Sequence, residues 1–248
     1  MTVTVEAPAE VALQIHGVVK VFDSDEGRTA ALHGVDLTVK RGEFVTLVGH
    51  SGCGKTTLLN IVAGLDTPTS GSVEVFGRTA FMFQDATLLP WLTARQNVEL
   101  ALKLRGVPRS QRKGQAEELL EVVRLSHAST RRPHELSGGM RQRVNLARCL
   151  AQNADVVLMD EPLGALDAMT RDLLHDEIER VVQERHLTVM FVTHNMREAV
   201  RLGDRAVLMA YGKVVLEERI DLPHPRIMDS AAVAERAGYL TERLHQAA

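Results

Sequence analysis

The spacing of apolar residues divides the chain into a strand-rich opening, a helical middle and a last part in which strands and helices alternate. Alternating apolar and polar residues predict strands over residues 11–22 and 32–39. Largely apolar runs at 43–48, 155–159 and 187–193 are typical of parallel strands that are buried on both faces. Further short strands are predicted at residues 72–76, 80–83, 206–210 and 213–217.

Helical spacing replaces the strand pattern between about residues 93 and 152. Val144, Ala147 and Ala151 mark one face of a helix there, and residues 117–123 fit an amphipathic helix. Another helix is predicted over 172–184. The sequence therefore predicts an α/β domain over residues 11–220 with a helical insertion over about 93–152. A flexible tail at 1–10 precedes it, and a short extension at 221–248 follows it, polar at first and then short-helical.

The composition is that of an ordinary globular protein. The 248 residues are 45% hydrophobic and 25% charged, with a formal net charge of −3, which argues against the basic footprint of a nucleic-acid binder. No apolar stretch approaches the ~20 residues that cross a bilayer, and the N-terminus lacks the pattern of a secretory signal. Cys53 and Cys149 lack metal-site spacing and suit a reducing compartment.

A glycine-rich segment that follows the first apolar run carries the most specific chemistry. It fits the pattern G-x-x-x-x-G-K-[ST] between a predicted strand and a predicted helix, the context that such a phosphate-binding loop requires. Glycines let backbone N–H groups surround phosphates, and the helix N-terminus adds its positive end. The expected nucleotide contacts are Gly49, His50, Ser51, Gly52, Cys53, Gly54, Lys55, Thr56 and Thr57. Lys55 is expected to neutralise phosphate charge, and the Thr56 hydroxyl to ligate Mg²⁺.

Two acidic residues end the apolar run at 155–159. Asp160 at the end of a strand suits a Mg²⁺-holding carboxylate, because the strand fixes it beside the metal. The adjacent Glu161 could orient and deprotonate an attacking water. In isolation the pair could equally be acids that cap the exposed end of a strand, but the phosphate loop favours the catalytic interpretation.

A second helix start with anion-binding character is predicted after Leu136. Ser137, Gly138, Gly139 and Met140 place a hydroxyl and two glycines at a helix N-terminus. This helix differs from the one after Lys55, which suggests a nucleotide shared between two copies of the chain. The alternative is a serine N-cap with glycines for tight packing.

The order of these segments resembles the ATP-binding subunit of ABC transporters over about residues 11–219. By this resemblance, residues 49–56 form the Walker A loop, 156–160 the Walker B strand, and 136–140 the signature, with Met140 where Gln is commoner. The resemblance implies an α/β fold with a P-loop NTPase core (ABC ATPase), an N-terminal antiparallel β subdomain and an inserted α-helical subdomain.

The same resemblance assigns four residues outside these motifs. Gln84 matches the glutamine that reaches Mg²⁺ and the attacking water, and His194, after the strand at 187–193, matches the switch histidine. Residues 164–167 resemble the D-loop, with Gly164 where Ser is usual and Asp167 retained. Phe22 falls where an aromatic residue stacks on adenine, although an apolar strand residue is equally often part of a core.

The family mechanism implied by the resemblance uses ATP, Mg²⁺ and a homodimer. Two copies close head-to-tail, with each nucleotide between one chain's Walker A loop and the other chain's signature. Glu161 is then the general base and His194 positions the γ-phosphate and water, with Lys55 and Gln84 as further catalytic residues. The expected metal ligands are Thr56, Gln84 and Asp160.

The segment after Gln84 resembles importers of the nitrate, sulfonate and taurine group. Its residues 88–93 read Leu-Leu-Pro-Trp-Leu-Thr, and in this family residues 84–93 contact a transmembrane permease subunit. Trp91 is expected to be an exposed anchor for that contact, or else to pack inside its own helical block. A periplasmic substrate-binding protein is the implied indirect partner, and the cytoplasmic face of the inner membrane the implied location, as a peripheral subunit.

Two other functions compete with import. A soluble ABC-type ATPase that does not take part in transport would share the nucleotide motifs, although such proteins usually carry two cassettes or a long coiled coil. A non-hydrolysing nucleotide sensor would not need Asp160 and Glu161. The position of Cys53 in the phosphate loop, near a helix N-terminus, predicts that its alkylation inhibits and that bound ATP protects it. The alternative, which the sequence favours, is a neutral and unreactive residue that fills the loop.

Overall fold

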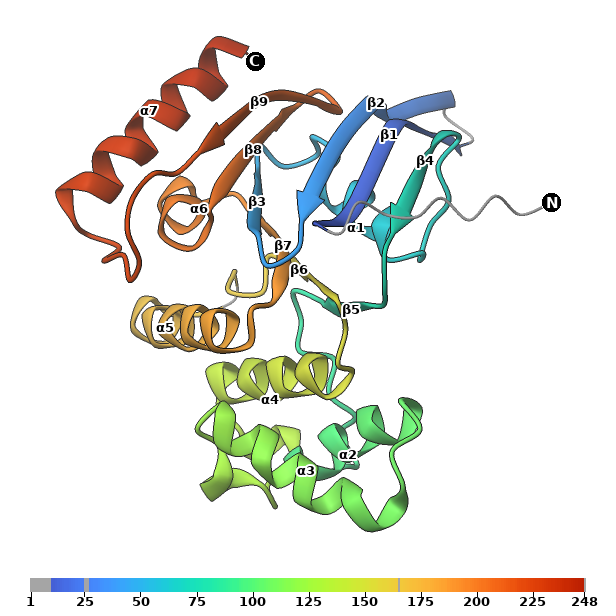
Figure 1. Ribbon diagram of the computed structural model, residues 1–248, viewed down its shortest axis with the longest axis vertical. Helices are drawn as coiled ribbons and strands as arrows, with labels where there is room; N and C mark the ends of the chain where they lie inside the picture. Colours follow the sequence, from blue (N-terminus) through green and yellow to red (C-terminus); the bar gives the residue numbers. More distant parts are fainter. Residues whose placement is uncertain (1–9, 25–26, 165, 248) are drawn as a thin grey trace.

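Two β-sheets form the framework of the protein in the computed structural model, which describes residues 10–24, 27–164 and 166–247 (Figure 1). The first sheet is antiparallel and has the order β2–β1–β4. Its strands are β1 (Val11–Ser24), β2 (Gly27–Lys40) and β4 (Ser70–Val75). The second has the order β5–β6–β7–β3–β8–β9 and is parallel except for β9. Its strands are β3 (Phe44–Val48), β5 (Thr79–Met82), β6 (Val156–Asp160), β7 (Thr188–Thr193), β8 (Arg205–Ala210) and β9 (Lys213–Arg219).

The parallel strands are buried on both faces, as their continuous apolar runs predict. On β6, Val156 and Leu158 pack with α1 (Lys55–Val62) and the antiparallel sheet, whereas Val157 and Met159 pack with the helices on the other side. Successive side chains of a strand point to opposite faces, so one apolar run supplies two cores. The α/β class with an antiparallel N-terminal sheet is confirmed.

The helical middle of the chain lies at one end of the molecule, where α2, α3 and α4 stand together beside α5 (Figure 1). The remaining helices are α2 (Ala94–Leu104), α3 (Arg109–Val122), α4 (Gly138–Ala151), α5 (Ala168–Arg185), α6 (Met196–Leu202) and α7 (Ala231–Ala247), with 3₁₀ turns at Ser126–Ala128 and Pro133–Glu135. The predicted helical character of residues 93–152 is confirmed. None of the helices in the described ranges combines the length and apolarity needed to span a bilayer.

The structure differs from the sequence prediction in three elements. Strand β2 begins at Gly27 rather than at residue 32, because it pairs with the whole of β1. Helix α6 was not predicted, since seven residues are too few to show a period. The C-terminal helix was predicted to be short but has 17 residues, and it buries Val233, Ala237 and Leu240 against α6 and β8. Residues 1–9 of the predicted tail lie outside the described residues, and the division at residue 220 remains a prediction.

The topology brings three loops to one edge of the main sheet. Strands β3, β6 and β7 are parallel neighbours, with Val48 opposite Thr193 and Asp160 opposite Val192. The segments that follow Val48, Asp160 and Thr193 therefore leave the sheet side by side. Carboxyl ends of parallel strands are where ligands bind in open α/β sheets.

Candidate functional site

The loop between β3 and α1 is shaped by close backbone approaches. A Cβ atom on Gly49 would lie 2.2 Å from the carbonyl oxygen of Met209, and one on Gly54 would lie 2.6 Å from that of Ala31. Gly54 also has a φ of 101°, a left-handed conformation that side chains oppose. Since Gly54 carries no side-chain cap, the first amides of α1 stay available to a ligand.

The side chain of Lys55 turns back towards this loop, on its buried side. Its Nζ donates hydrogen bonds to the carbonyl oxygens of Gly49 (2.8 Å) and His50 (3.0 Å), and its Cys53 Sγ contact is 3.7 Å. The Lys55 side chain is buried and Cys53 is 7% exposed. The other expected contacts face outward: His50, Ser51, Gly52 and Thr56 are exposed and Thr57 is half-buried. The loop therefore presents polar atoms to solvent with a cation beneath them.

Two oxygen ligands meet beside the start of α1. The Thr56 hydroxyl donates to Asp160 Oδ1 at 3.1 Å, which joins residues 104 positions apart. Burial raises the pKa of Asp160, and the charge of Glu161 adds to this, while the Thr56 hydrogen bond and Lys55 act in the opposite direction. A hydroxyl and a carboxylate are ligands that suit Mg²⁺, so the donor set fits that ion.

Glu161 and His194 form the next pair along the same edge. His194 Nδ1 lies 3.0 Å from Glu161 Oε2, and the Glu161 amide donates to the carbonyl of Val192 at 3.0 Å. Glu161 has a φ of 42°, a left-handed conformation that costs a non-glycine residue about 1–3 kcal/mol. The strained backbone conformation therefore occurs at a residue whose carboxylate can accept a proton. The His194 side chain is 62% exposed and so accessible to a ligand.

Gln84 and Gly164 complete this side of the site. A Cβ atom on Gly164 would lie 3.3 Å from Gln84 Nε2 and 3.7 Å from Glu161 Oε2, so both side chains flank the glycine. The backbone carbonyl of Gln84 accepts a hydrogen bond from Gln142 Nε2 at 2.5 Å, which anchors the segment after β5 to α4. The structure thus places Gln84 beside Glu161, as the sequence predicts for a shared site.

The start of α4, the second predicted anion-binding helix start, makes no contact of these kinds with the phosphate loop in the described part of the chain. Within the described residues, no hydrogen bond or ion pair joins Ser137 or Asp167 to the phosphate loop. Ser137 is exposed, and its Oγ accepts from the Met140 amide at 3.3 Å. Asp167 caps α5, accepting from the amide (3.0 Å) and hydroxyl (2.7 Å) of Thr170, which lowers its pKa. Ala165 of the predicted D-loop lies outside the described residues.

Packing explains one of the two glycines of that helix start. A Cβ atom on Gly139 would lie 2.1 Å from Thr170 Cγ2, so α4 and α5 touch at this point. Gly138 is less constrained, with its nearest neighbour, Leu166 Cδ2, at 3.3 Å from a Cβ. The two alternatives raised by the sequence, an anion site and a packed serine cap, therefore both remain compatible with the geometry.

Phe22 lies on β1, where it is 44% exposed and pairs with Thr29 of β2. The Lys20 ammonium sits 4.8 Å from the centre of its ring. An exposed ring is available for stacking, but an adenine contact stays a prediction.

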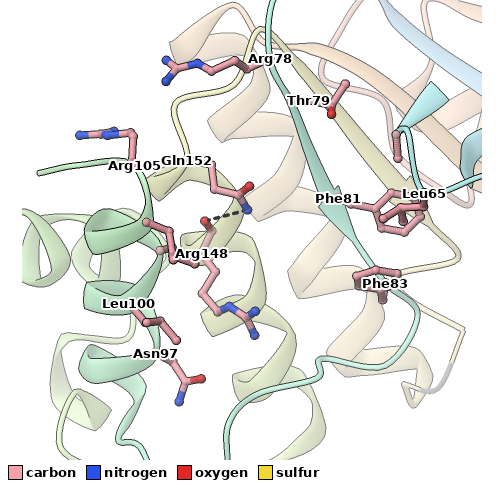
Figure 2. A pocket seen from close by; sticks show the side chains of 13 residues that line it. Leu65, Arg78, Thr79, Phe81, Phe83, Asn97, Leu100, Arg105, Arg148 and Gln152 are labelled. Carbon is pink, nitrogen blue, oxygen red and sulfur yellow. Dashed lines mark hydrogen bonds between the residues drawn. The ribbon is translucent and has the colours of Figure 1, made fainter. Parts of the chain in front are cut away.

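A groove of about 580 Å³ between the main sheet and the helical end was not predicted (Figure 2). Phe81 and Phe83 line one side, and Leu100 and Leu104 of α2 the other, with Leu104 79% exposed. Arg78, Arg105 and Arg148 also line it. Among the described residues, none of these three guanidinium groups forms an ion pair. Trp91 is 66% exposed, which contradicts packing inside its own helical block.

The C-terminal helix also reaches the site, which sequence patterns gave no means to foresee. The His245 ring stacks on that of His50, with centroids 6.2 Å apart and an interplanar angle of 7°. A polar cluster behind His194 was missed as well; it consists of the half-buried Arg171 and the buried His175, Thr193 and Glu198. Both arise from tertiary contacts between elements that are far apart in the sequence.

The chain is similar in sequence to a known protein family and to characterised relatives. A family model described as "ABC transporter" matches residues 32–164. The aliphatic sulfonates import ATP-binding protein SsuB of Burkholderia ambifaria is 44% identical over 244 residues, which cover 96% of this chain and 73% of that protein. The bicarbonate transport ATP-binding protein CmpC of Synechococcus elongatus is 46% identical over 209 residues and 79% of this chain. The chain spans about a third (32%) of the length of CmpC.

Solved structures agree with this similarity. The dimeric structure of a post-hydrolysis state of the ATP-binding cassette MJ0796, bound to ADP and Pi, has a TM-score of 0.76 and 34% sequence identity. The match covers 85% of this chain and all of that cassette. That cassette is similar in fold and holds hydrolysis products.

Proposed function

Because the chain belongs to the ABC transporter family, we propose that it is the ATP-hydrolysing subunit of an importer for a small anion. One observation carries the proposal: a single sheet edge brings together a Lys55-containing phosphate loop, the Thr56–Asp160 pair at 3.1 Å and the Glu161–His194 pair at 3.0 Å. These are the parts that phosphoryl transfer to water needs, namely phosphate binding, metal ligation and a base.

Each side chain has a defined task in this proposal. The loop amides and Lys55 bind the phosphates and offset their charge. Thr56 and Asp160, with Gln84, would hold Mg²⁺, which would neutralise charge on the phosphate oxygens. Glu161 orients a water molecule and accepts its proton, while His194 contacts the γ-phosphate and holds the Glu161 carboxylate in place through their hydrogen bond.

A homodimer supplies the remaining contacts. Ser137 and Asp167 are exposed at two helix starts, whereas Gly138 and Met140 are half-buried and Gly139 is buried. Within the described residues, Ser137–Met140 and Asp167 make no hydrogen bond or ion pair to the phosphate loop of the same chain. We assign them to the nucleotide held by a second copy, with the Ser137 hydroxyl and the amides of α4 directed at its phosphates. Phe22 then stacks on the adenine. The dimeric state of the related MJ0796 cassette supports this arrangement.

The groove and Trp91 form the surface that we assign to the permease. Residues 84–93 run from Gln84 beside Glu161 to exposed Trp91, so the segment connects the site to the surface. The groove offers apolar side chains and three arginines without an ion pair in the described part of the chain (Figure 2). A short permease helix with apolar residues and a carboxylate would fit it.

The substrate class follows from the relatives and from residues 88–93. SsuB relatives are importers of aliphatic sulfonates and CmpC a transporter of bicarbonate by their names, and the segment 88–93 resembles nitrate and taurine importers. All are small anions or zwitterions. We propose that a periplasmic binding protein selects among them, and that this chain works as a peripheral subunit at the cytoplasmic face of the inner membrane.

The test is Glu161→Gln, which keeps the shape of the side chain but cannot accept a proton. We expect steady-state ATP hydrolysis to fall by about 10²–10⁴-fold, with ATP binding retained and ATP-bound dimers accumulating in size-exclusion chromatography. Glu218→Gln is the matched control, since Glu218 is about equally exposed (25% against 23%) and ion-paired on β9. Hydrolysis by Glu161→Gln at the wild-type rate would overturn the assignment. Co-purification with a permease separates import from a soluble ABC-type ATPase.

A further inference from the structure

A buried carboxylate lies directly behind the His194 loop. Glu198, in the first turn of α6, is 6% exposed, and its Oε2 accepts a hydrogen bond from the Thr193 hydroxyl at 2.6 Å. The same hydroxyl accepts from the Asn195 amide at 3.0 Å. Thr193 and Asn195 flank His194, so one carboxylate fixes the backbone on both sides of the residue that contacts Glu161.

The carboxylate is also tied to α5. Arg171 Nε lies 3.9 Å from Glu198 Oε1, and Arg171 Nη2 donates to the carbonyl of Leu166 at 2.9 Å. Leu166 directly precedes Asp167, the residue that we assign to the partner's nucleotide. Arg171 and Glu198 therefore connect the segment before α5 with the loop that carries His194.

A small polar cavity joins this cluster to the reaction centre. It has a volume of about 40 Å³, comparable with the share of one water molecule in the liquid, and Glu161, Gly164, Arg171, Thr193, His194 and Glu198 are among its lining residues. Glu198 and Glu161 thus line the same cavity. Movement of Glu198 would therefore change the surroundings of the Glu161–His194 pair.

The charge in the cluster is held without complete hydrogen bonding. Burial alone would raise the pKa of Glu198, but His175, Thr193 and Arg171 outweigh it and the pKa is lowered, so the carboxylate is ionised. His175 is fully buried, and its Nε2 lies 3.6 Å from Glu198 Oε1 and its Nδ1 3.7 Å from Asp172 Oδ1. Neither ring nitrogen has a hydrogen-bond partner among the described residues. Buried charges of this kind are costly, and they recur at functional sites.

We propose that Glu198 is a positioning residue for ATP hydrolysis: it holds the His194 loop through the Thr193 hydroxyl, and Arg171 links it to Leu166. The inference rests on the proposed function. Glu198 is buried behind the His194 loop, so we expect it to act on turnover rather than on nucleotide binding.

Thr193→Val tests the link, because valine keeps the shape of threonine and removes the hydroxyl. We expect kcat for ATP hydrolysis to fall by about 10–100-fold with KM and ATP affinity within about twofold of wild type. Thr193→Ser restores the hydroxyl and should recover kcat to within about threefold. Glu198→Gln removes the charge but keeps an oxygen that can accept from the Thr193 hydroxyl, so its kcat should lie between the wild-type and Thr193→Val values.

Glu179→Gln is the control for removing a buried glutamate beside a histidine. Glu179 is 7% exposed and lies 2.7 Å from His224, and within the described residues no hydrogen bond or ion pair joins it to the His194 loop. Its kcat should stay at the wild-type value. Thermal unfolding of every variant shows which remain folded, and if Glu198→Gln does not fold, the serine–valine pair at Thr193 decides alone.

The outcomes separate this inference from the proposed function. If the wild-type chain hydrolyses no ATP, alone or with its permease, the proposed function fails. If the wild type is active and Thr193→Val keeps its kcat, or loses ATP affinity instead, the positioning role of Glu198 is wrong.

Discussion

Helices α1 and α4 both begin with glycine-containing segments expected to bind phosphate, yet their surroundings differ. The start of α1 has Gly54 in a left-handed conformation with no side-chain cap, and Lys55 lies beneath it. The start of α4 has Ser137 in an extended conformation, and the serine caps its own helix through the Met140 amide. The first start lies at the sheet edge with Asp160 and Glu161, whereas the second stands exposed on the helical side.

One nucleotide site can thus be divided between two surfaces of the protein. The phosphate loop is complete in one chain, because neighbouring parallel strands bring its partners to the same edge. The start of α4 offers donors but none of these partners. We infer that the first half binds ATP by itself and that the second half contributes to turnover when a second copy approaches.

The largest effect is expected for Lys55→Ala at the start of α1. Removing the cation beneath the loop takes away a charge-assisted contact to phosphate, so ATP affinity should fall by about 100-fold or more. Isothermal titration calorimetry with ATP measures this directly. Lys103→Ala, at an exposed position of α2, is the control and should bind as the wild type does. Equal affinity of both variants would remove the phosphate loop from the binding site.

Ser137→Arg addresses the other helix start. A long cation there should block approach of a second copy, so hydrolysis should fall by about 100-fold while ATP affinity stays within twofold. Ser110→Arg on α3 carries the same change at an exposed position outside the proposed interface. Sedimentation with ATP, in the Glu161→Gln background, measures dimer formation. A variant that dimerises and hydrolyses normally would leave α4 without a nucleotide role.

The sequence predicted those parts of the candidate site that depend only on neighbouring residues in the chain. Asp160 ends a buried strand, and the phosphate loop, Glu161 and His194 each follow one, so the strand pattern and the motif together locate them. The serine cap of α4 was one of two alternatives that the sequence left open, and it could be raised because a cap depends on residues within one helical turn. Gly49 and Gly54 were placed correctly in a loop, but the carbonyl groups that exclude their side chains were not.

What escaped prediction depends on contacts between distant elements. Lys55 was expected to point at a ligand, and its hydrogen bonds to the loop carbonyls have no sequence pattern. The arginine-lined groove is assembled from β5, α2 and α4, and the Glu198 cluster from β7, α5 and α6. Helix α6 is too short for periodicity, although Asn195 caps it by accepting from the amides of Arg197 and Glu198.

Gly139→Ala separates the role of Gly139 in packing from a role in nucleotide binding. The added Cβ would clash with Thr170 Cγ2, which should destabilise the protein by about 1–3 kcal/mol in urea unfolding. Thr170→Ser removes the clashing methyl group, so the double variant should regain much of this stability. If the double variant is stable but still slow in hydrolysis, Gly139 serves both packing and the second copy. Unchanged stability of Gly139→Ala would show that α4 and α5 can move apart to accommodate the added methyl group.

His224 supplies the smallest effect and a reference far from both helix starts. It lies near Asp204, whose Oδ2 accepts from the Phe44 amide at 2.8 Å, at the opposite end of β3 from the phosphate loop. The pKa of His224 is raised to about 9, because the carboxylates of Asp204 and Glu179 favour its protonated form.

A pKa raised in the folded state stabilises the protein below the unfolded value of about 6.5 and loses this effect as pH rises through about 9. His224→Asn should therefore lower the free energy of unfolding by about 1–2 kcal/mol at pH 6.5 and by progressively less towards pH 9.5. Urea unfolding of both proteins across this range measures the difference, and ATP affinity at pH 7 should not change. A constant difference at all pH values would mean that packing, not charge, holds the segment. A change in ATP affinity would show that the effects of Lys55 and Ser137 variants need not be local, and the contrast between the two helix starts would lose its support.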